Sequence, residues 1–310
     1  MFQQVYFEIS GACNARCPFC VTGAGMGPKG GFISFEVFAR AIDRLLETGL
    51  IGDRTCINLF NWGEPFLHRD LEKILEYLNH RRVGFSLSTN ASIKREFTPA
   101  MITHLRELSF SLPGFSQSSY DRIHGFDFST IKDNIRKLVV SLRRLGYGGQ
   151  SKIFFHIYQF NLDEIAPARA FARELGAEFC PYYAFIADYN RARAYLEEKL
   201  SYRELKELGE NLFLADMADK IEQMPATYRC PQYDILVLDE NAEILTCCYL
   251  SKGHADYSCG SLFDDDLMAH LARREQQPEC GFCLKSGLSY LVHHSATPAF
   301  CRDISGPAKG

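Results

Sequence analysis

Strand-like runs alternate with helix-like segments over roughly the first 185 residues, and this alternation constrains the fold more than any other feature. Six runs have the length and the β-branched or aromatic content of buried strands: residues 5–10, 56–60, 84–88, 108–112, 152–157 and 178–183. Five intervening segments place apolar residues at helical spacing: residues 35–48, 70–81, 98–106, 130–145 and 162–175. This pattern predicts an α/β fold with a parallel sheet and right-handed crossovers. Because six units are too few for a closed eight-fold barrel, we expect an open, partial (β/α)6 barrel.

The net charge and the hydrophobic content exclude several classes of protein. Of the 310 residues, 34 are Lys or Arg and 38 are Asp or Glu, which gives a net charge of −4. Such a chain has no basic field for a nucleic-acid backbone, so we expect no nucleic-acid partner. It has no run of ~18 apolar residues, so we expect no membrane partner. The first residues lead into a strand without a signal-peptide pattern, which predicts a cytoplasmic location.

Capping patterns mark the start of several expected helices. Asn161 and Glu164 have the spacing of a capping box at the start of one helix. Residues 191–222 have the pattern of one or two helices, with Ser201 and Glu204 again in capping-box spacing.

After residue 225 the pattern changes from alternating strands and helices to a hairpin. Residues 235–238 and 242–246 predict two antiparallel strands joined by a short turn, and a short helix is expected near residues 264–274. A unit this small has little core of its own, so we expect a metal to help hold it. We therefore predict three parts: the barrel over residues 1–190, a helical linker over 191–225 and a C-terminal β-hairpin and helix subdomain over 226–310.

The chain contains twelve cysteines, and they fall into two main groups. A reducing cytosol disfavours disulfides, so dense cysteine in a chain without a signal pattern indicates metal ligation or catalysis. Three cysteines lie close together near the N-terminus: Cys13, Cys17 and Cys20. Seven follow residue 229: Cys230, Cys247, Cys248, Cys259, Cys280, Cys283 and Cys301. We therefore expect two separate metal sites.

The first group directly follows the first predicted strand. Spacings of four and three residues let the thiolates of Cys13, Cys17 and Cys20 converge from one loop, at the carboxyl end of a parallel strand. Three ligands leave one coordination position open, which is typical of a reactive metal centre rather than a closed structural one. A zinc loop and three buried thiols are the alternatives.

This spacing, CxxxCxxC with Phe19 before the last cysteine, resembles the signature of the radical SAM superfamily. The resemblance covers about residues 1–185 and implies a partial, TIM-like barrel. It implies that the three cysteines hold a 4Fe-4S cluster whose fourth iron binds S-adenosyl-L-methionine. It also implies reductive cleavage of that cofactor to a 5′-deoxyadenosyl radical, which abstracts hydrogen from an unactivated C–H bond. The electron would come from an external donor such as flavodoxin or ferredoxin.

The resemblance assigns further cofactor-binding residues at the ends of later strands. Trp62, Gly63 and Glu64 correspond to the Gly-Gly-Glu stretch that meets the methionine ammonium, with Trp62 in place of the commoner glycine. Further candidates for hydrogen bonds to the ribose or the methionine carboxylate follow the third, fourth and fifth strands: Ser88, Thr89, Asn90, Ser111 and His156. Polar residues are also common turn formers at strand ends, so the order of the set matters more than any member.

The C-terminal cysteines resemble a SPASM or shorter twitch module, which binds auxiliary 4Fe-4S clusters. The single-cluster form of this module has one cysteine before the hairpin, one after it and a late CxxC. The cysteines that match this order are Cys230, Cys247, Cys280 and Cys283. Cys259 and Cys301 are possible substitutes or additional ligands. A four-cysteine zinc ribbon has the same spacing and is the alternative.

Cys247 and Cys248 are adjacent, so on a strand their side chains would point to opposite faces. One of them would then ligate the cluster, and Cys248 is our candidate for a hydrogen-atom donor to a carbon radical. Its alternative role is that of a small buried side chain.

We therefore expect a radical SAM enzyme that acts on a small metabolite or a peptide. Oxidation, dehydrogenation or cross-linking is one outcome, in which the auxiliary cluster takes an electron from the substrate or ligates it. A redox-neutral epimerase that uses Cys248 is the second. A metal-stabilised binding protein without radical chemistry is the alternative from another class.

Overall fold

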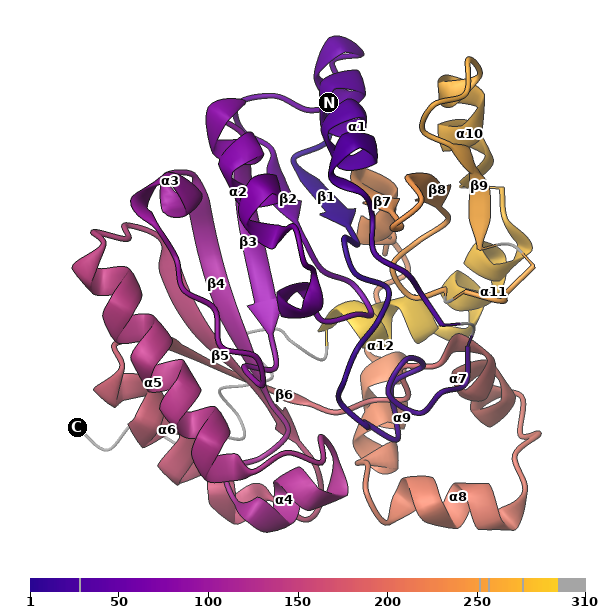
Figure 1. The fold of residues 1–310 in the computed structure, drawn as a ribbon. Coiled ribbons are helices and arrows are strands. Elements are labelled where there is room, and N and C mark those ends of the chain that lie inside the picture. Colours follow the sequence, from indigo (N-terminus) through magenta and orange to yellow (C-terminus); the bar gives the residue numbers. More distant parts are fainter. Residues whose placement is uncertain (28, 251, 256, 275, 295–310) are drawn as a thin grey trace.

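The structure is a computed structural model, and it describes residues 1–294 except 28, 251, 256 and 275. The described residues form one nine-stranded sheet in the order β6-β5-β4-β3-β2-β1-β7-β8-β9 (Figure 1). Its strands are β1 (Gln4–Phe7), β2 (Cys56–Asn58), β3 (Gly84–Thr89), β4 (Leu105–Leu112), β5 (Gln150–Ile157), β6 (Glu178–Tyr183), β7 (Ile235–Leu238), β8 (Glu243–Leu245) and β9 (Ser258–Ser261). Strands β1 to β7 pair parallel with one another, and β8 pairs antiparallel with both β7 and β9. The sheet does not close, which confirms the predicted α/β fold and open, partial barrel.

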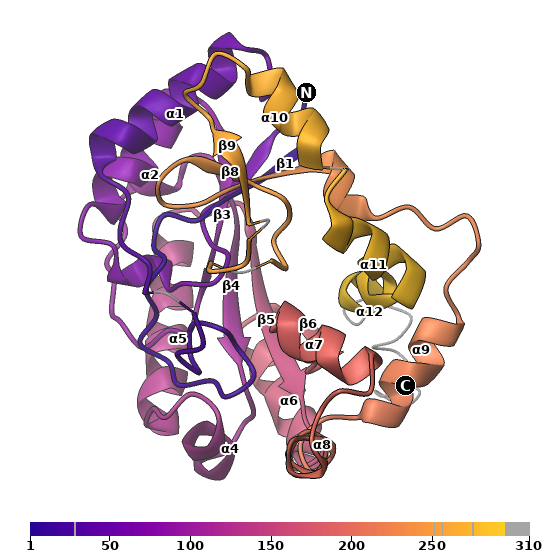
Figure 2. The same cartoon turned by 90° about the vertical axis from the view of Figure 1, so that its right-hand side faces the viewer.

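Helices cover the outer face of the parallel strands (Figure 2). They are α1 (Phe35–Glu47), α2 (Leu71–His80), α3 (Pro99–Ile102), α4 (Gln117–Arg122), α5 (Phe128–Arg144) and α6 (Ile165–Glu174), with 3-10 turns η1 (Pro65–Leu67) and η2 (Leu162–Glu164). The apolar stripe of α1 packs on β1, where the rings of Phe7 and Phe38 lie 5.2 Å apart. Since side chains alternate along a strand, Tyr6 and Glu8 face the opposite, concave side of the sheet.

The predicted hairpin continues the same sheet. Strand β7 pairs parallel with β1, from Gln4 opposite Ile235 to Phe7 opposite Leu238. After the turn, β8 returns antiparallel to β7. The C-terminal segment is therefore joined to the barrel through backbone hydrogen bonds, and the proposed boundaries near residues 190 and 225 stay a prediction.

Several local predictions differ from the structure. The helix expected over residues 98–106 ends at Ile102, because the chain enters β4 at Leu105. Residues 191–222 contribute to three helices, α7 (Tyr189–Leu196), α8 (Tyr202–Gly209) and α9 (Leu214–Glu222), rather than one or two. The later elements are η3 (Pro231–Asp234), α10 (Leu267–Arg274), α11 (Pro278–Ser286) and α12 (Leu288–His294).

One predicted capping box is present and the other is not. Ser201 and Glu204 cap α8 reciprocally, as expected. The Asn161 side chain makes no cap, and Glu164 instead accepts hydrogen bonds from Ser116 and Ser119 across the molecule. A tertiary partner has replaced the local one, which sequence spacing could not indicate.

Among the described residues, no helix has both the length and the apolar character that crossing a bilayer requires.

Candidate functional site

The three N-terminal cysteines lie in the loop that follows β1, and we call residues 13–20 the cysteine loop. Burial raises the pKa of the Cys13 thiol to about 11 and also raises the pKa of Cys17 and Cys20. Cys20 raises the pKa of both other thiols, and Cys13 raises that of Cys17. Such mutual repulsion requires proximity, so the loop gathers three half-buried sulfurs at the carboxyl edge of the sheet.

Contacts from neighbouring segments fix the backbone of the cysteine loop. The Arg16 amide donates to the His124 carbonyl at 3.1 Å, which ties the loop to the segment after α4. Within the loop, the Cys20 amide donates to the Cys17 carbonyl at 3.2 Å. A Cβ on Gly23 would lie 2.6 Å from the Cys17 nitrogen, so the chain needs glycine there to turn back on the loop.

Glu8, at the end of β1, fixes the segment that carries the predicted methionine-binding motif. Its Oε1 accepts hydrogen bonds from the amides of Trp62 at 2.7 Å and Gly63 at 2.8 Å. A Cβ on Gly63 would overlap the Ser10 carbonyl oxygen, so only glycine allows this approach. Sequence reasoning missed Glu8, although an acidic residue in a strand-like run next to the cysteines is an unusual feature.

The Glu64 side chain is buried, and its carboxylate accepts hydrogen bonds from groups of the protein itself. Its carboxylate accepts from the amides of Phe66 at 2.9 Å and Asn90 at 2.7 Å, and from the Thr89 hydroxyl at 2.8 Å. Burial raises its pKa to about 7, and these three hydrogen bonds oppose the rise. The carboxylate thus links the segments after β2 and β3.

Asn90 extends this link to the cysteine loop. Its side-chain amide donates to the Asn14 oxygen at 3.1 Å and lies 3.9 Å from the Cys13 sulfur. Thr89 and Asn90 are buried, whereas Ser88 is half-buried. The structure therefore brings the motifs after β1, β2 and β3 together.

Ser111 and His156 form a second polar group on the concave face. The Ser111 hydroxyl lies 3.2 Å from His156 Nε2, and the hydroxyl of Tyr182 on β6 contacts the same nitrogen. Burial lowers the pKa of His156 to about 4, so the ring is neutral at pH 7. Burial raises the pKa of Tyr182, and Cys17 and Cys20 raise it further, so the Tyr182 hydroxyl lies near the cysteine loop. The sequence pattern named Ser111 and His156 but did not indicate the contact between Tyr182 and His156.

The residues around the cysteine loop fit an iron–sulfur cluster and an acceptor-rich ligand. The side-chain nitrogens Asn61 Nδ2 and Trp62 Nε1 are buried and have no hydrogen-bond partner among the described residues. Buried donors of this kind are costly unless a ligand accepts from them. Three soft thiolates suit an iron–sulfur cluster, and open donors suit the carboxylate and hydroxyls of S-adenosyl-L-methionine. Phe19 is buried in the same loop, with its ring 5.9 Å from that of Tyr158.

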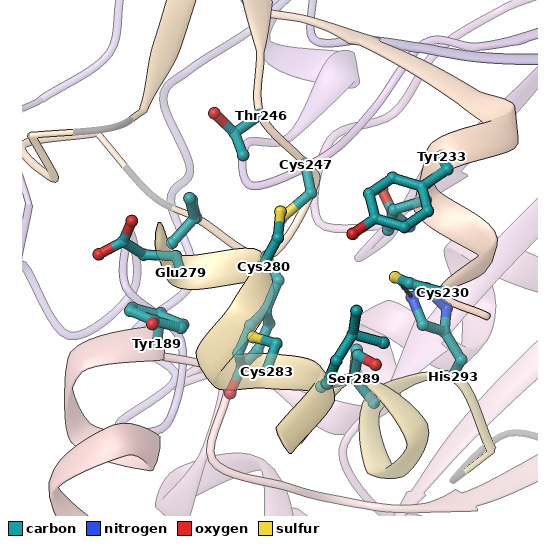
Figure 3. Close-up of a pocket in the computed structure, with 15 residues that line it drawn as sticks. Tyr189, Cys230, Tyr233, Thr246, Cys247, Glu279, Cys280, Cys283, Ser289 and His293 are labelled. Atoms are coloured by element: carbon teal, nitrogen blue, oxygen red, sulfur yellow. Dashed lines mark hydrogen bonds between the residues drawn. The ribbon is translucent and has the colours of Figure 1, made fainter. Parts of the chain in front are cut away.

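The C-terminal cysteines line a pocket formed by η3, the segment after β8, α11 and α12, which we call the auxiliary pocket (Figure 3). Its wall contains the four sulfurs of the predicted cluster: Cys230, Cys247, Cys280 and Cys283. His293 also lines it, with Nε2 3.9 Å from the Cys230 sulfur. Four soft donors around one cavity fit a cubane that has all its corners ligated by protein.

The remaining C-terminal cysteines lie elsewhere. Cys248 follows β8 in an irregular segment rather than on a strand, and it is absent from the lining of the auxiliary pocket. Its amide donates to the Gln232 side chain at 3.2 Å, and besides burial the neighbouring Cys247 and Cys230 raise the pKa of its thiol. Cys259 is a core residue of β9 with its sulfur 3.4 Å from the Thr246 hydroxyl. Cys301 lies outside the described residues.

No three His, Cys, Asp or Glu side chains within the described part of the chain are close enough to hold a single metal ion. The eleven cysteines that the structure describes are all free thiols. Thiolates on a four-iron cluster each bind a different iron, so they need not meet at one point.

Comparison with protein families supports the N-terminal assignment. Residues 7–154 match the profile of the Radical SAM superfamily, over the cysteine loop and the strands up to β5. The matched region contains the cysteine loop, and the match supports the resemblance to the radical SAM superfamily that the cysteine spacing indicates. A comparison with curated proteins finds no match.

Solved structures share the fold at low sequence identity. SuiB from Streptococcus suis, bound to the precursor peptide SuiA, is 15% identical, with 94% of this chain and 71% of SuiB covered and a TM-score of 0.58. Native anSMEcpe, with bound AdoMet and Cp18Cys peptide, is 14% identical, with 93% of this chain and 83% of anSMEcpe covered and a TM-score of 0.57. SuiB has also been solved with S-adenosylmethionine. These similarities support the partial barrel of the whole chain.

Proposed function

We propose that this chain is a radical SAM enzyme with one S-adenosyl-L-methionine site at the cysteine loop and an auxiliary 4Fe-4S cluster in the auxiliary pocket. One observation carries the proposal: the loop with three thiols contacts Asn90 after β3, and Glu8 just before the loop holds Gly63 after β2, all inside the region that matches the superfamily. The expected electron donor is a flavodoxin or a ferredoxin, and the expected location is the cytoplasm.

Each residue of the first site has a separate part in this proposal. Cys13, Cys17 and Cys20 would hold the cluster and leave one iron open. The Gly63 turn would let the methionine group approach the sheet edge, while Glu64 would keep Asn90 in place. When bound, the cluster and its cofactor would supply a 5′-deoxyadenosyl radical that removes hydrogen from the substrate.

Residues on the concave face would orient the nucleoside and exclude water. Ser88, Ser111 and His156 are candidates for the ribose and carboxylate contacts, with Thr89 and Trp62 behind them. Because His156 is neutral at pH 7, it can accept or donate a hydrogen bond without adding charge next to a sulfonium.

The four sulfurs of the auxiliary pocket support an oxidative outcome. A SPASM or twitch type cluster held by Cys230, Cys247, Cys280 and Cys283 would accept an electron from the substrate, leading to dehydrogenation or cross-linking. A peptide is the favoured substrate class, since the similar structures of SuiB and anSMEcpe were solved with peptides, and a small metabolite is the alternative.

An epimerase is the second candidate, and the position of Cys248 favours it. Cys248 does not line the auxiliary pocket, so its thiol would stay free of the cluster and could donate a hydrogen atom. Product analysis in heavy water separates the two outcomes. Deuterium at one inverted carbon, lost in Cys248→Ala, supports epimerisation, while a two-hydrogen mass loss supports oxidation.

Anaerobic reconstitution tests the proposal itself. With a strong reductant, the protein should release 5′-deoxyadenosine from S-adenosyl-L-methionine, and Cys17→Ala should not. Cys56→Ala is the matched control, because Cys56 lies on β2 at the opposite end of the sheet. This variant should cleave S-adenosyl-L-methionine as the wild type does. About eight irons per chain would support two cubanes. Zinc without sulfide would instead support the metal-stabilised binding protein.

A further inference from the structure

Arg274, the last residue of α10, is a buried arginine whose side chain binds backbone carbonyls from two other segments. It is 3% exposed. Its Nε donates to the Thr246 carbonyl at 3.2 Å, and one terminal nitrogen donates to the carbonyls of Gln232 at 2.9 Å and Ile235 at 2.7 Å. A planar guanidinium can satisfy several acceptors at fixed angles, which a lysine ammonium does not do as well.

These contacts connect Arg274 to the cysteines of the auxiliary pocket. Thr246 immediately precedes Cys247 in the chain, and Gln232 follows Cys230 by two residues. The backbone carbonyl of Arg274 itself lies 3.4 Å from the Cys280 sulfur. All three ligand-bearing segments, from η3, the end of β8 and α11, therefore meet at one residue.

The charge of Arg274 also reaches these sulfurs. It interacts favourably with the thiolate forms of Cys230, Cys247 and Cys280. Four thiolates around a 4Fe-4S cluster give the site a net negative charge, and reduction adds another. A buried positive charge stabilises the more negative state, because burial weakens the screening by water. Local charge and hydrogen bonding are among the factors that set cluster potentials.

We propose that Arg274 is the positioning residue of the auxiliary cysteine site, and that its buried positive charge raises the reduction potential of the cluster bound there. The inference rests on the proposed function, since it needs an iron–sulfur cluster in the auxiliary pocket. A higher potential makes that cluster a better acceptor for an electron from a substrate radical.

The test isolates the auxiliary cluster in the full-length chain by changing Cys13, Cys17 and Cys20 to alanine together. In this background, Arg274→Gln removes the charge and Arg274→Lys keeps it. Arg273→Gln is the matched control, because it removes the same charge from the exposed face of the same helix. Iron content and the reduced fraction at poised potentials are measured by EPR and absorbance.

We expect Arg274→Gln to lower the ratio of reduced to oxidised cluster at least tenfold at a fixed potential, which is about 59 mV for a one-electron couple. The Arg274→Lys and Arg273→Gln chains should stay near the parent ratio, with Arg274→Lys binding less iron. An unchanged ratio in an iron-loaded Arg274→Gln chain overturns the inference about Arg274 alone. Absence of iron from the parent background overturns the auxiliary cluster and the inference together.

The lysine variant decides the matter if Arg274→Gln loses its iron. If the Arg274→Lys chain keeps its iron and its cluster has the reduction potential of the parent background, the role of the charge is supported. Equal loss of iron from both variants would overturn that role.

Discussion

The two cysteine sites are built in opposite ways. The cysteine loop draws three thiols from eight consecutive residues and is held in place by contacts from the segments after β2, β3 and α4. The auxiliary pocket draws four thiols from three segments that are distant in the sequence. Three cysteines would leave one iron of a four-iron cluster open to a ligand, whereas the four cysteines of the auxiliary pocket would occupy all four irons. Under our proposal, chemistry belongs to the first site and electron transfer to the second.

Removing one cysteine from each site should separate these roles. The loss of S-adenosyl-L-methionine cleavage on changing the first site is the largest effect that we expect. Cys20→Ala should lower the rate of S-adenosyl-L-methionine cleavage by about a thousandfold or more, equivalent to ~4 kcal/mol of barrier. Cys283→Ala should still cleave the cofactor, because it leaves the first site intact, but should lose turnover of the substrate. Equal loss of cleavage in both variants would remove the distinction. Quantification of 5′-deoxyadenosine by chromatography gives the answer.

The adjacent cysteines offer the next contrast, in iron content. Cys247→Ala should lose close to half of the bound iron, because Cys247 lines the auxiliary pocket. Cys248→Ala should keep its iron, since Cys248 does not line that pocket. Iron and sulfide analysis of the purified proteins measures both. Iron loss confined to Cys248→Ala would reverse our assignment of the pair.

Gly63 allows a test of the contacts behind the first site. Gly63→Ala adds a Cβ that overlaps the Ser10 carbonyl, and such overpacking costs about 1–3 kcal/mol of stability or more. We expect a lower melting temperature and weaker binding of S-adenosyl-L-methionine. Gly31→Ala is the matched control, because its added Cβ meets no described atom within 4 Å. If Gly63→Ala and Gly31→Ala melt at the same temperature, then Gly63 does not approach the Ser10 carbonyl this closely in solution.

The smallest effect we expect is the titration of Glu8. Burial raises its pKa to about 7 from the usual 4.5, against the opposing hydrogen bonds from Trp62 and Gly63. The folded state therefore binds the proton more tightly than the unfolded state, and stability from this group declines as the pH rises from about 4.5 to about 7. Infrared difference spectra of wild type against Glu8→Gln should show a carboxyl band that disappears near pH 7. A midpoint near 4.5 would mean that Glu8 is solvated.

Local patterns in the sequence predicted the features that depend on neighbours in the chain. Strand and helix alternation gave the open sheet, and the spacing of Cys13, Cys17 and Cys20 indicated the radical SAM domain that the family match supports. The same reasoning failed where a distant partner decides the outcome. Glu164 binds Ser116 and Ser119 rather than capping its own helix, and Leu105 joins β4 although helical spacing continues through it.

The site contacts that sequence reasoning missed join residues distant in the chain. Glu8 reaches the amides of Trp62 and Gly63, and Tyr182 reaches His156 from the next strand. Arg274 binds carbonyls about 30 to 40 residues away. None of these residues belongs to a short motif, so only the fold brings each to its partner.

Electron–nuclear double resonance on the reduced protein with S-adenosyl-L-methionine labelled at the methionine nitrogen tests the open coordination site most directly. The account predicts a hyperfine coupling from the labelled nitrogen to the cluster of the cysteine loop, present in the wild type and in Cys283→Ala. A reduced cluster that shows no such coupling with the cofactor bound would contradict it.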